Sequence, residues 1–378
     1  MLAVGVFVFD LTGSPSQVAL MLILRMVPLA CFGILAAAIV ERVGHRHMLM
    51  FGVIAMICVS ALLAFLSATD QIQLWHIGMG TFVSGMFWVL DFPVRKALLG
   101  GAVDAGSIGH AMSLDTVTNN GTRMLGPILG GVFLQWVGLT GVYGFAAMAY
   151  VLALLWTISL RPKTRSPRHS DYGVFSAITR SLSLLRSRPL LAGVLMVTAV
   201  FNLWGFPFVS MIPVIGKEVL ELNSFHVGLL MSAEGCGALV GALLIVGVGQ
   251  VRYYRRLYIC GISLYLVVAV IFSQVTFSAG AAVCLLLVGL GVAAFAAMQS
   301  TLILLKAPEE ARSLMMGLLS VCVGMAPIGF LHIGLLADWL GARAAIAILA
   351  SEGIVALYWV LHKWPSLLDL EYLSNKQG

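Results

Sequence analysis

Three charged side chains lie deep inside long apolar stretches of this sequence: Arg25, Arg123 and Glu234. Each lies about nine residues inside its stretch, which is ~13 Å at about 1.5 Å per helical residue. If the stretches cross a membrane, these charges lie near the middle of a core about 30 Å thick. A charge there costs at least about 2.5–3.5 kcal/mol. We therefore expect each to face a water-filled cavity or a partner.

The composition indicates that a membrane is the surrounding solvent. Hydrophobic residues make up 60% of the 378 residues and charged residues only 10%, against about 25% charged in soluble chains. The mean hydropathy is +1.01. One soluble core could not bury this much apolar surface. The sequence predicts an all-α protein of the inner (plasma) membrane of a bacterium, in contact with membrane lipid.

Apolar stretches separated by polar breaks predict twelve helices, the first of them incomplete. The first stretch is too short to cross a membrane, and we expect it to be the back half of a truncated helix. The stretches run over 1–11, 16–40, 48–67, 74–99, 114–137, 141–160, 190–215, 226–249, 257–277, 279–305, 313–337 and 343–361.

The basic residues predict the orientation of the chain. Of the 22 Lys and Arg, 18 fall on one side of the predicted spans, and the opposite loops hold only Lys217 and Arg343. Since positive loops stay inside, the middle loop and the C-terminus are predicted to be cytoplasmic. The basic residues are spread over separate loops between the spans, so they do not form the single basic surface that binds nucleic acid.

A polar, basic segment over 161–189 divides the chain near its middle, with six predicted spans on each side. We predict an N-terminal bundle over 1–160, a cytoplasmic linker over 161–189, a C-terminal bundle over 190–363 and a cytoplasmic tail over 364–378. The halves repeat weakly, at similar offsets in two places, where Arg25 aligns with Glu234 and Trp136 with Trp339. Such repeats pack around a central cavity with the binding site near the midplane.

Two short motifs resemble those of major facilitator transporters. The loop motif Glu41, Arg42, Gly44, Arg46 resembles the charged run after the second helix of that superfamily, where a charge relay locks one access state at the cytoplasmic end. The alternative is a solvated basic loop. The second motif, Gly126, Pro127, Gly130, Gly131, resembles the Gly-Pro motif of drug-exporting members. Small residues at this spacing also serve ordinary helix packing.

The stretch from Phe92 to Gly131 resembles the group that includes the enterobactin exporter and the macrolide efflux pumps, and Asn202 and Pro213 agree with it. The resemblance implies two pseudo-symmetric six-helix bundles and proton-coupled export of a small amphiphilic molecule, such as a drug or a siderophore, by alternating access. In this superfamily the fifth and eighth helices face each other. We therefore expect Arg123 and Glu234 to pair in one access state, and a proton on Glu234 to release Arg123. A static ion pair is the alternative.

Other polar residues are weaker candidates for the cavity. Asn119 and Asn202 join the three charges as candidate proton-coupling or substrate-cavity residues, and the aromatic residue Trp204 is a candidate for the cavity lining. Glu352 lies near the middle of the last span, where a packing or lipid-edge role is as plausible as a functional one. A lone histidine in a span, such as His332, is more often a hydrogen-bonded packing residue than a proton carrier.

Several functions remain as alternatives. A proton-coupled importer of a sugar or metabolite and an inactive truncated transporter both fit the same spans. A membrane-embedded enzyme is disfavoured, because the sequence has no phosphate-binding loop, no His-Glu-x-x-His run and no serine elbow. The six cysteines lie in apolar runs without a Cys-x-x-Cys pair, so we predict no metal and no cofactor.

Overall fold

The computed structural model describes the chain except for residues 44, 103–107, 160–186, 247–252, 309–311 and 369–378. Within helices, the side chains of 30–45, 90, 92–117, 246 and 312–314 also lie outside the described part. The predicted linker therefore falls almost wholly outside the described residues, as does most of the predicted tail.

The N-terminal half is helical where it is described. Its helices are α1 (Leu2–Thr12), α2 (Pro15–Val43), α3 (His45–Ala68), α4 (Leu74–Ala102) and α5 (Ile108–Ser159). The helix α5 holds two predicted spans. They are separated at Gly138, whose φ of 70° and ψ of −164° are not helical. Because a side chain is strained at such a φ, glycine suits this break.

The C-terminal half begins with an irregular span. That span consists of α7 (Pro189–Val200), a π-helical turn η2 (Phe201–Gly205), a 3₁₀ segment η3 (Phe206–Met211) and α8 (Ile212–Glu218). The regular helices that follow are α9 (Ser224–Val246), α10 (Tyr254–Gln274) and α11 (Ser278–Lys306). The chain ends with α12 (Arg312–Val323), α13 (Ala326–Leu340), α14 (Ala342–Lys363) and the short η6 (Pro365–Leu367).

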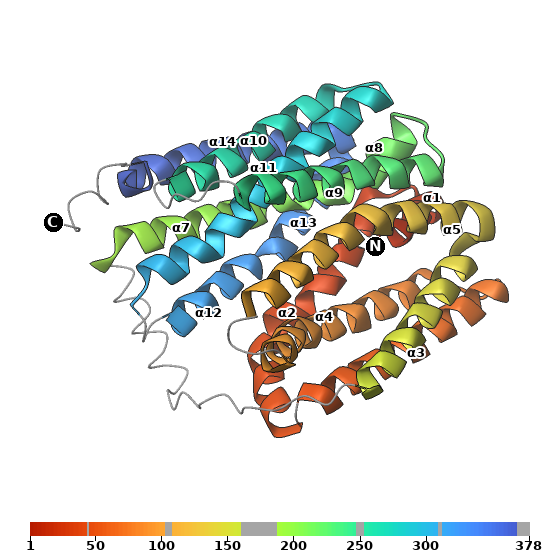
Figure 1. Ribbon diagram of the computed structural model, residues 1–378. Helices are drawn as coiled ribbons and strands as arrows, with labels where there is room; N and C mark the ends of the chain where they lie inside the picture. The colour runs from red at the N-terminus through yellow and green to blue at the C-terminus, as the bar shows by residue number, and fades with distance from the viewer. Residues whose placement is uncertain (44, 103–107, 160–186, 247–252, 309–311, 369–378) are drawn as a thin grey trace.

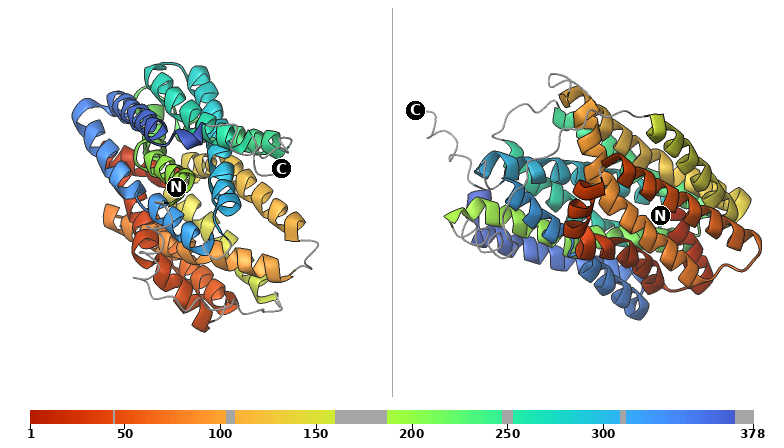
Figure 2. Two further views of the ribbon diagram at one scale, coloured as in Figure 1. Left: turned by 90° about the vertical axis from the view of Figure 1, so that its left-hand side faces the viewer. Right: turned by 90° about the horizontal axis from the view of Figure 1, so that it is seen from below.

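These helices form two bundles that lie side by side (Figure 1). In the N-terminal bundle, α2 packs on α4, and α3 packs on both α4 and α5. In the C-terminal bundle, α11 packs between α9 and α10, and α14 packs on α10 and α13. The bundles meet where α5 lies against α9 and where α2 lies against α13. Figure 2 shows the same helices from two further sides.

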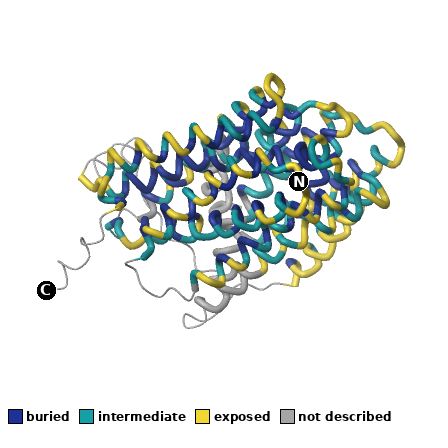
Figure 3. Tube along the Cα trace, turned by 90° about the horizontal axis from the view of Figure 1, so that it is seen from above, coloured by how far each residue is buried: buried dark blue, intermediate teal, exposed yellow. Residues whose placement is uncertain are grey.

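Helix length and surface chemistry define a multi-pass membrane protein. Eight helical stretches among the described residues are long and apolar enough to cross a membrane, and one of them, Thr118–Ser159, is the pair broken at Gly138. The outward side of the helices is exposed, whereas their facing sides are buried (Figure 3). Large apolar side chains such as Phe51, Leu243 and Val355 are more than 60% exposed. A soluble protein rarely exposes apolar patches on this scale, so they face lipid.

Polar contacts join the two halves at the end of the molecule that holds the α1–α2 and α8–α9 connections, which we call the outer end. Lys217 Nζ lies 3.0 Å from Asp10 Oδ2. The backbone N–H of Ser16 donates to Asp338 Oδ1 at 3.2 Å, and the backbone N–H of Ser224 donates to the side chain of Gln135. Away from this end, the first part of α5 exposes Asn119 and Thr122. The two halves are thus joined at the outer end, and the first part of α5 is accessible.

Candidate functional site

An ion pair connects the two bundles where α5 lies against α9. Arg123 Nη2, on α5, lies 2.7 Å from Glu234 Oε1, on α9. The arginine side chain is 44% exposed and the glutamate side chain 15% exposed. The structure therefore brings together the two charges for which the sequence predicts a pair. The carboxylate lies inside the packing, while the guanidinium reaches solvent-accessible space.

Close packing fixes the position of Glu234. An added Cβ at Gly289 would lie 2.0 Å from the Glu234 carbonyl oxygen, and one at Gly235 would lie 2.7 Å from Met124 Cα. The backbone around Glu234 is therefore in contact with α11 on one side and α5 on the other. Tyr265, on α10, is 3% exposed and lies near the ion pair. This packing holds the carboxylate at the junction of the two bundles.

The Gly-Pro motif contributes to the same junction. An added Cβ at Gly131 would lie 2.7 Å from the Ser224 carbonyl oxygen, and one at Gly228 would lie 2.4 Å from the Pro127 carbonyl oxygen. Glycine at both positions allows the backbones of α5 and α9 to approach closely. An added Cβ at Gly126 would meet nothing within 4 Å, and one at Gly130 would meet only Leu2 at 3.6 Å. Half of the motif thus forms the contact between bundles.

Arg25 occupies a separate place within the N-terminal bundle. It lies on α2, and an added Cβ at Gly85 of α4 would be 2.2 Å from its carbonyl oxygen. Its Nε is buried and has no hydrogen-bond partner among the described residues. Tyr150, in the second half of α5, lies near both Arg25 and Asp91 of α4. Sequence reasoning did not select Asp91 or Tyr150, because only packing brings these distant polar residues together.

The two candidate asparagines lie in different surroundings. Asn119 is exposed on α5, one helical turn before Arg123, and its carbonyl oxygen accepts a hydrogen bond from Thr122 at 2.8 Å. Asn202 is 5% exposed, and its Nδ2 donates to the Thr198 carbonyl oxygen at 2.9 Å. In this state Asn119 shares the accessible face of α5 with Arg123, whereas Asn202 is buried in the C-terminal bundle.

The loop motif is described only at its last member. The side chains of Glu41 and Arg42, and the whole of Gly44, lie outside the described residues. Arg46 donates a hydrogen bond from Nη2 to the backbone carbonyl of Ile158, at the end of α5. The motif thus contacts the sixth span of its own bundle, and the charge relay stays a prediction.

A second polar cluster lies in the C-terminal bundle. Glu352 Oε2, on α14, accepts a hydrogen bond from Trp204 Nε1 at 3.0 Å and lies 3.6 Å from His332 Nδ1. The sequence showed Glu352 and His332 as isolated polar residues in two spans. It contained no signal that they meet, or that Trp204 of η2 joins them.

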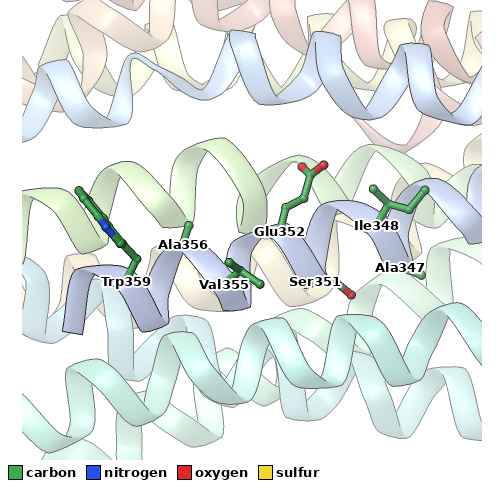
Figure 4. A pocket seen from close by; sticks show the side chains of 7 residues that line it. All are labelled: Ala347, Ile348, Ser351, Glu352, Val355, Ala356 and Trp359. Carbon is green, nitrogen blue, oxygen red and sulfur yellow. The ribbon is translucent and has the colours of Figure 1, made fainter. Parts of the chain in front are cut away.

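Glu352 also lines a pocket of about 800 Å³ along one face of α14 (Figure 4). The pocket lies on α14, whereas the Arg123–Glu234 pair is formed by α5 and α9. Among the described residues, no group of three or more His, Cys, Asp or Glu side chains is arranged to hold a metal ion.

Comparison with solved structures identifies the class of the fold. The chain is similar to a bacterial homologue of the human lysosomal transporter Spinster in an inward-facing, unoccupied conformation, with a TM-score of 0.77 and 12% identity over 97% of this chain and 94% of that one. It is also similar to a transporter of the POT family, with a TM-score of 0.71 and 14% identity over 97% and 93% of the two chains. The two bundles, joined through α5–α9 and α2–α13, therefore have the fold of these proteins, as the sequence predicted.

Sequence comparison identifies the family to which the chain belongs. It belongs to the transmembrane secretion effector family of major facilitator transporters, whose model matches residues 1–370. It is 19% identical to macrolide efflux protein A of Streptococcus pyogenes, over 90% of this chain and 86% of that protein. It is 25% identical to the enterobactin exporter of Salmonella choleraesuis, over 69% and 61% of the two chains. The chain is therefore a small-molecule transporter and not an enzyme.

Proposed function

We propose that this protein is a proton-coupled exporter of small amphiphilic compounds, such as a drug or a siderophore, in the inner membrane of a bacterium. The observation that carries the proposal is the 2.7 Å ion pair between Arg123 and Glu234, because it joins two bundles that must move relative to each other. The names of the macrolide and enterobactin exporters support the outward direction of transport and the class of compound.

The ion pair provides a switch that a proton can operate. In the closed-outer-end state, an ionised Glu234 attracts Arg123 across the α5–α9 contact. A proton on Glu234 removes its charge, so that the attraction to Arg123 is lost and the bundles are free to rock. In the export cycle the loaded protein opens to the outer side and the substrate leaves. Glu234 then takes up a proton from that side, the protein returns to the closed-outer-end state, and the proton leaves to the cytoplasm as the ion pair with Arg123 forms again.

The orientation completes the proposal. With the linker and the C-terminus in the cytoplasm, the closed outer end faces the periplasm or exterior, and the accessible face of α5 opens to the cytoplasm. This is the state in which an exporter takes up its substrate. Arg25 and Asn119 would line the path, and Glu41, Arg42, Gly44 and Arg46 would close the cytoplasmic end in the opposite state.

The test is transport of the amphiphilic dye Hoechst 33342 in proteoliposomes across an imposed pH gradient. We expect Glu234→Gln to bind the dye but to lose the acceleration that the gradient gives the wild type. Glu218→Gln is the matched control, because it makes the same chemical change at an exposed position at the end of α8. Undiminished acceleration in Glu234→Gln would remove Glu234 from the coupling mechanism.

A further inference from the structure

The carboxylate of Glu352 lies in a membrane span, and among the described side chains it has no permanently charged partner. It is at the eleventh position of the 22-residue helix α14, so both helix ends are about 15 Å away at 1.5 Å per residue. The basic residues of α14 lie towards its ends, and Arg343 donates to the Val275 carbonyl oxygen there. Among the described side chains, neither Lys nor Arg forms an ion pair with Glu352.

The hydrogen bonding of Glu352 leaves one oxygen available. Oε2 accepts from Trp204 and faces His332, whereas Oε1 accepts no hydrogen bond from the part of the chain that the structure describes. The side chains of Glu352 and His332 are 40% and 41% exposed. An ionisable side chain that stays partly exposed at this depth is costly, and it persists where it has a functional partner.

The groove beside Glu352 is an open depression, and all of its lining residues belong to α14. Its volume of about 800 Å³ falls within the roughly 300–1,000 Å³ typical of small-molecule pockets. Apart from Glu352 and Ser351, its lining is apolar, and Trp359 lies at one end (Figure 4). Val355 lines the groove and is 68% exposed, so the groove opens to the lipid-facing surface.

The position of α14 separates this groove from the central site. α14 packs on α10, α13 and the irregular seventh span, all within the C-terminal bundle, whereas the Arg123–Glu234 pair lies at the α5–α9 contact. A molecule in the groove would enter sideways from the hydrocarbon core. It would contact Glu352, whose hydrogen-bond partner Trp204 belongs to the π-helical turn η2. π-Helical turns occur frequently at functional sites.

We propose that the α14 groove binds lipophilic organic cations from the hydrocarbon core, with Glu352 as the counter-charge. A carboxylate selects a positive charge, the apolar lining selects a lipophilic body, and an aromatic ring at the end favours a cation further. An amine of a lipid headgroup has the same charge, but at about 15 Å from the helix ends it does not reach Glu352. This inference rests on the proposed export function, because it names the class of compound that the exporter takes from the membrane.

The test is equilibrium binding of radiolabelled tetraphenylphosphonium to the purified full chain in phosphatidylcholine nanodiscs. Loss of a charge-assisted contact predicts roughly ten-fold or more weaker binding in Glu352→Gln. Val355→Trp, which fills the groove without changing charge, should weaken binding similarly. Glu218→Gln should bind like the wild type, and tetraphenylborate, an anion of the same shape, should not compete.

Each outcome decides the assignment. Wild-type binding by Glu352→Gln, or effective competition by tetraphenylborate, would overturn it. If Glu352→Gln does not fold, as judged by size-exclusion chromatography, unchanged binding in Val355→Trp overturns it instead. Displacement of the phosphonium by added phosphatidylethanolamine would assign the groove to a headgroup amine and would also overturn it.

Glu234→Gln separates this proposal from the export mechanism. It should lose the response to a pH gradient but keep its phosphonium binding, since its change lies outside the groove. If phosphonium binding is lost in Glu234→Gln and kept in Glu352→Gln, the cation site lies at the central pair. The groove proposal then fails while the export function stands.

Discussion

The contact between α5 and α9 at the outer end must separate when that end opens, so its tightness controls the balance of the two access states. Replacing Gly228 by alanine would place a Cβ 2.4 Å from the Pro127 carbonyl oxygen and 3.2 Å from Gly131 Cα. Both obstacles are backbone atoms, so the helices must shift. Overpacking of this kind costs about 1–3 kcal/mol. At about 1.4 kcal/mol per factor of ten, the closed outer end becomes roughly 5- to 150-fold less populated relative to the open one.

The control for Gly228→Ala is Gly121→Ala on α5, where an added Cβ would meet nothing within 4 Å. Both substitutions give the helix the same intrinsic gain of up to about 1 kcal/mol, so the difference between them isolates the clash. Spin labels on Thr69 and Phe277, both exposed at the outer end, would report the separation of the bundles by double electron–electron resonance in a cysteine-free background.

We expect Gly228→Ala to shift the label distances towards a longer population and Gly121→Ala to leave them unchanged. A wild-type distribution in Gly228→Ala would show that the α5–α9 contact does not limit opening. An equal shift in Gly121→Ala would show that helix propensity, and not the clash, causes the effect.

The remaining predictions concern the outer end and the orientation. Asp338→Ala removes the acceptor of hydrogen bonds from Ser14 and Ser16. A net hydrogen bond contributes about 1 kcal/mol. The same spin labels should therefore show the outer end open roughly five-fold more often. Glu218→Ala, an exposed acid at the same end, should have no effect. Equal populations in the two variants would show that Asp338 does not hold the outer end closed. Arg165→Cys should react with a membrane-impermeant maleimide only in inside-out vesicles, and labelling in right-side-out vesicles would invert the orientation.

The sequence predicted the fold because its signals are local and strong. Apolar stretches located the helices of both halves. The linker over 161–189 stays a prediction, because nearly all of it lies outside the described residues. The break at Gly138 was visible as a polar gap, although the chain stays helical on both sides of it. The irregular turn Phe201–Gly205 was not predictable, because apolar periodicity does not distinguish a π-helical turn from a regular one.

The candidate site was predictable only in part. Arg123 and Glu234 were conspicuous because single charges in apolar spans are costly, and the resemblance supplied the pairing of their helices. The Glu352–His332 contact was missed, since each residue alone fits ordinary packing and no spacing along the chain relates them. Gly228 was missed for the same reason: its role depends on the backbone of a helix about a hundred residues away.

The most direct test of the ion-pair switch is proton release on substrate binding. Hoechst 33342 is added to the purified protein in weakly buffered detergent solution, and the pH indicator pyranine reports released protons. If substrate binding favours the state in which ionised Glu234 pairs with Arg123, the wild type releases protons and Glu234→Gln, which still binds the dye, releases none. Equal proton release from the two proteins would contradict the role assigned to the pair.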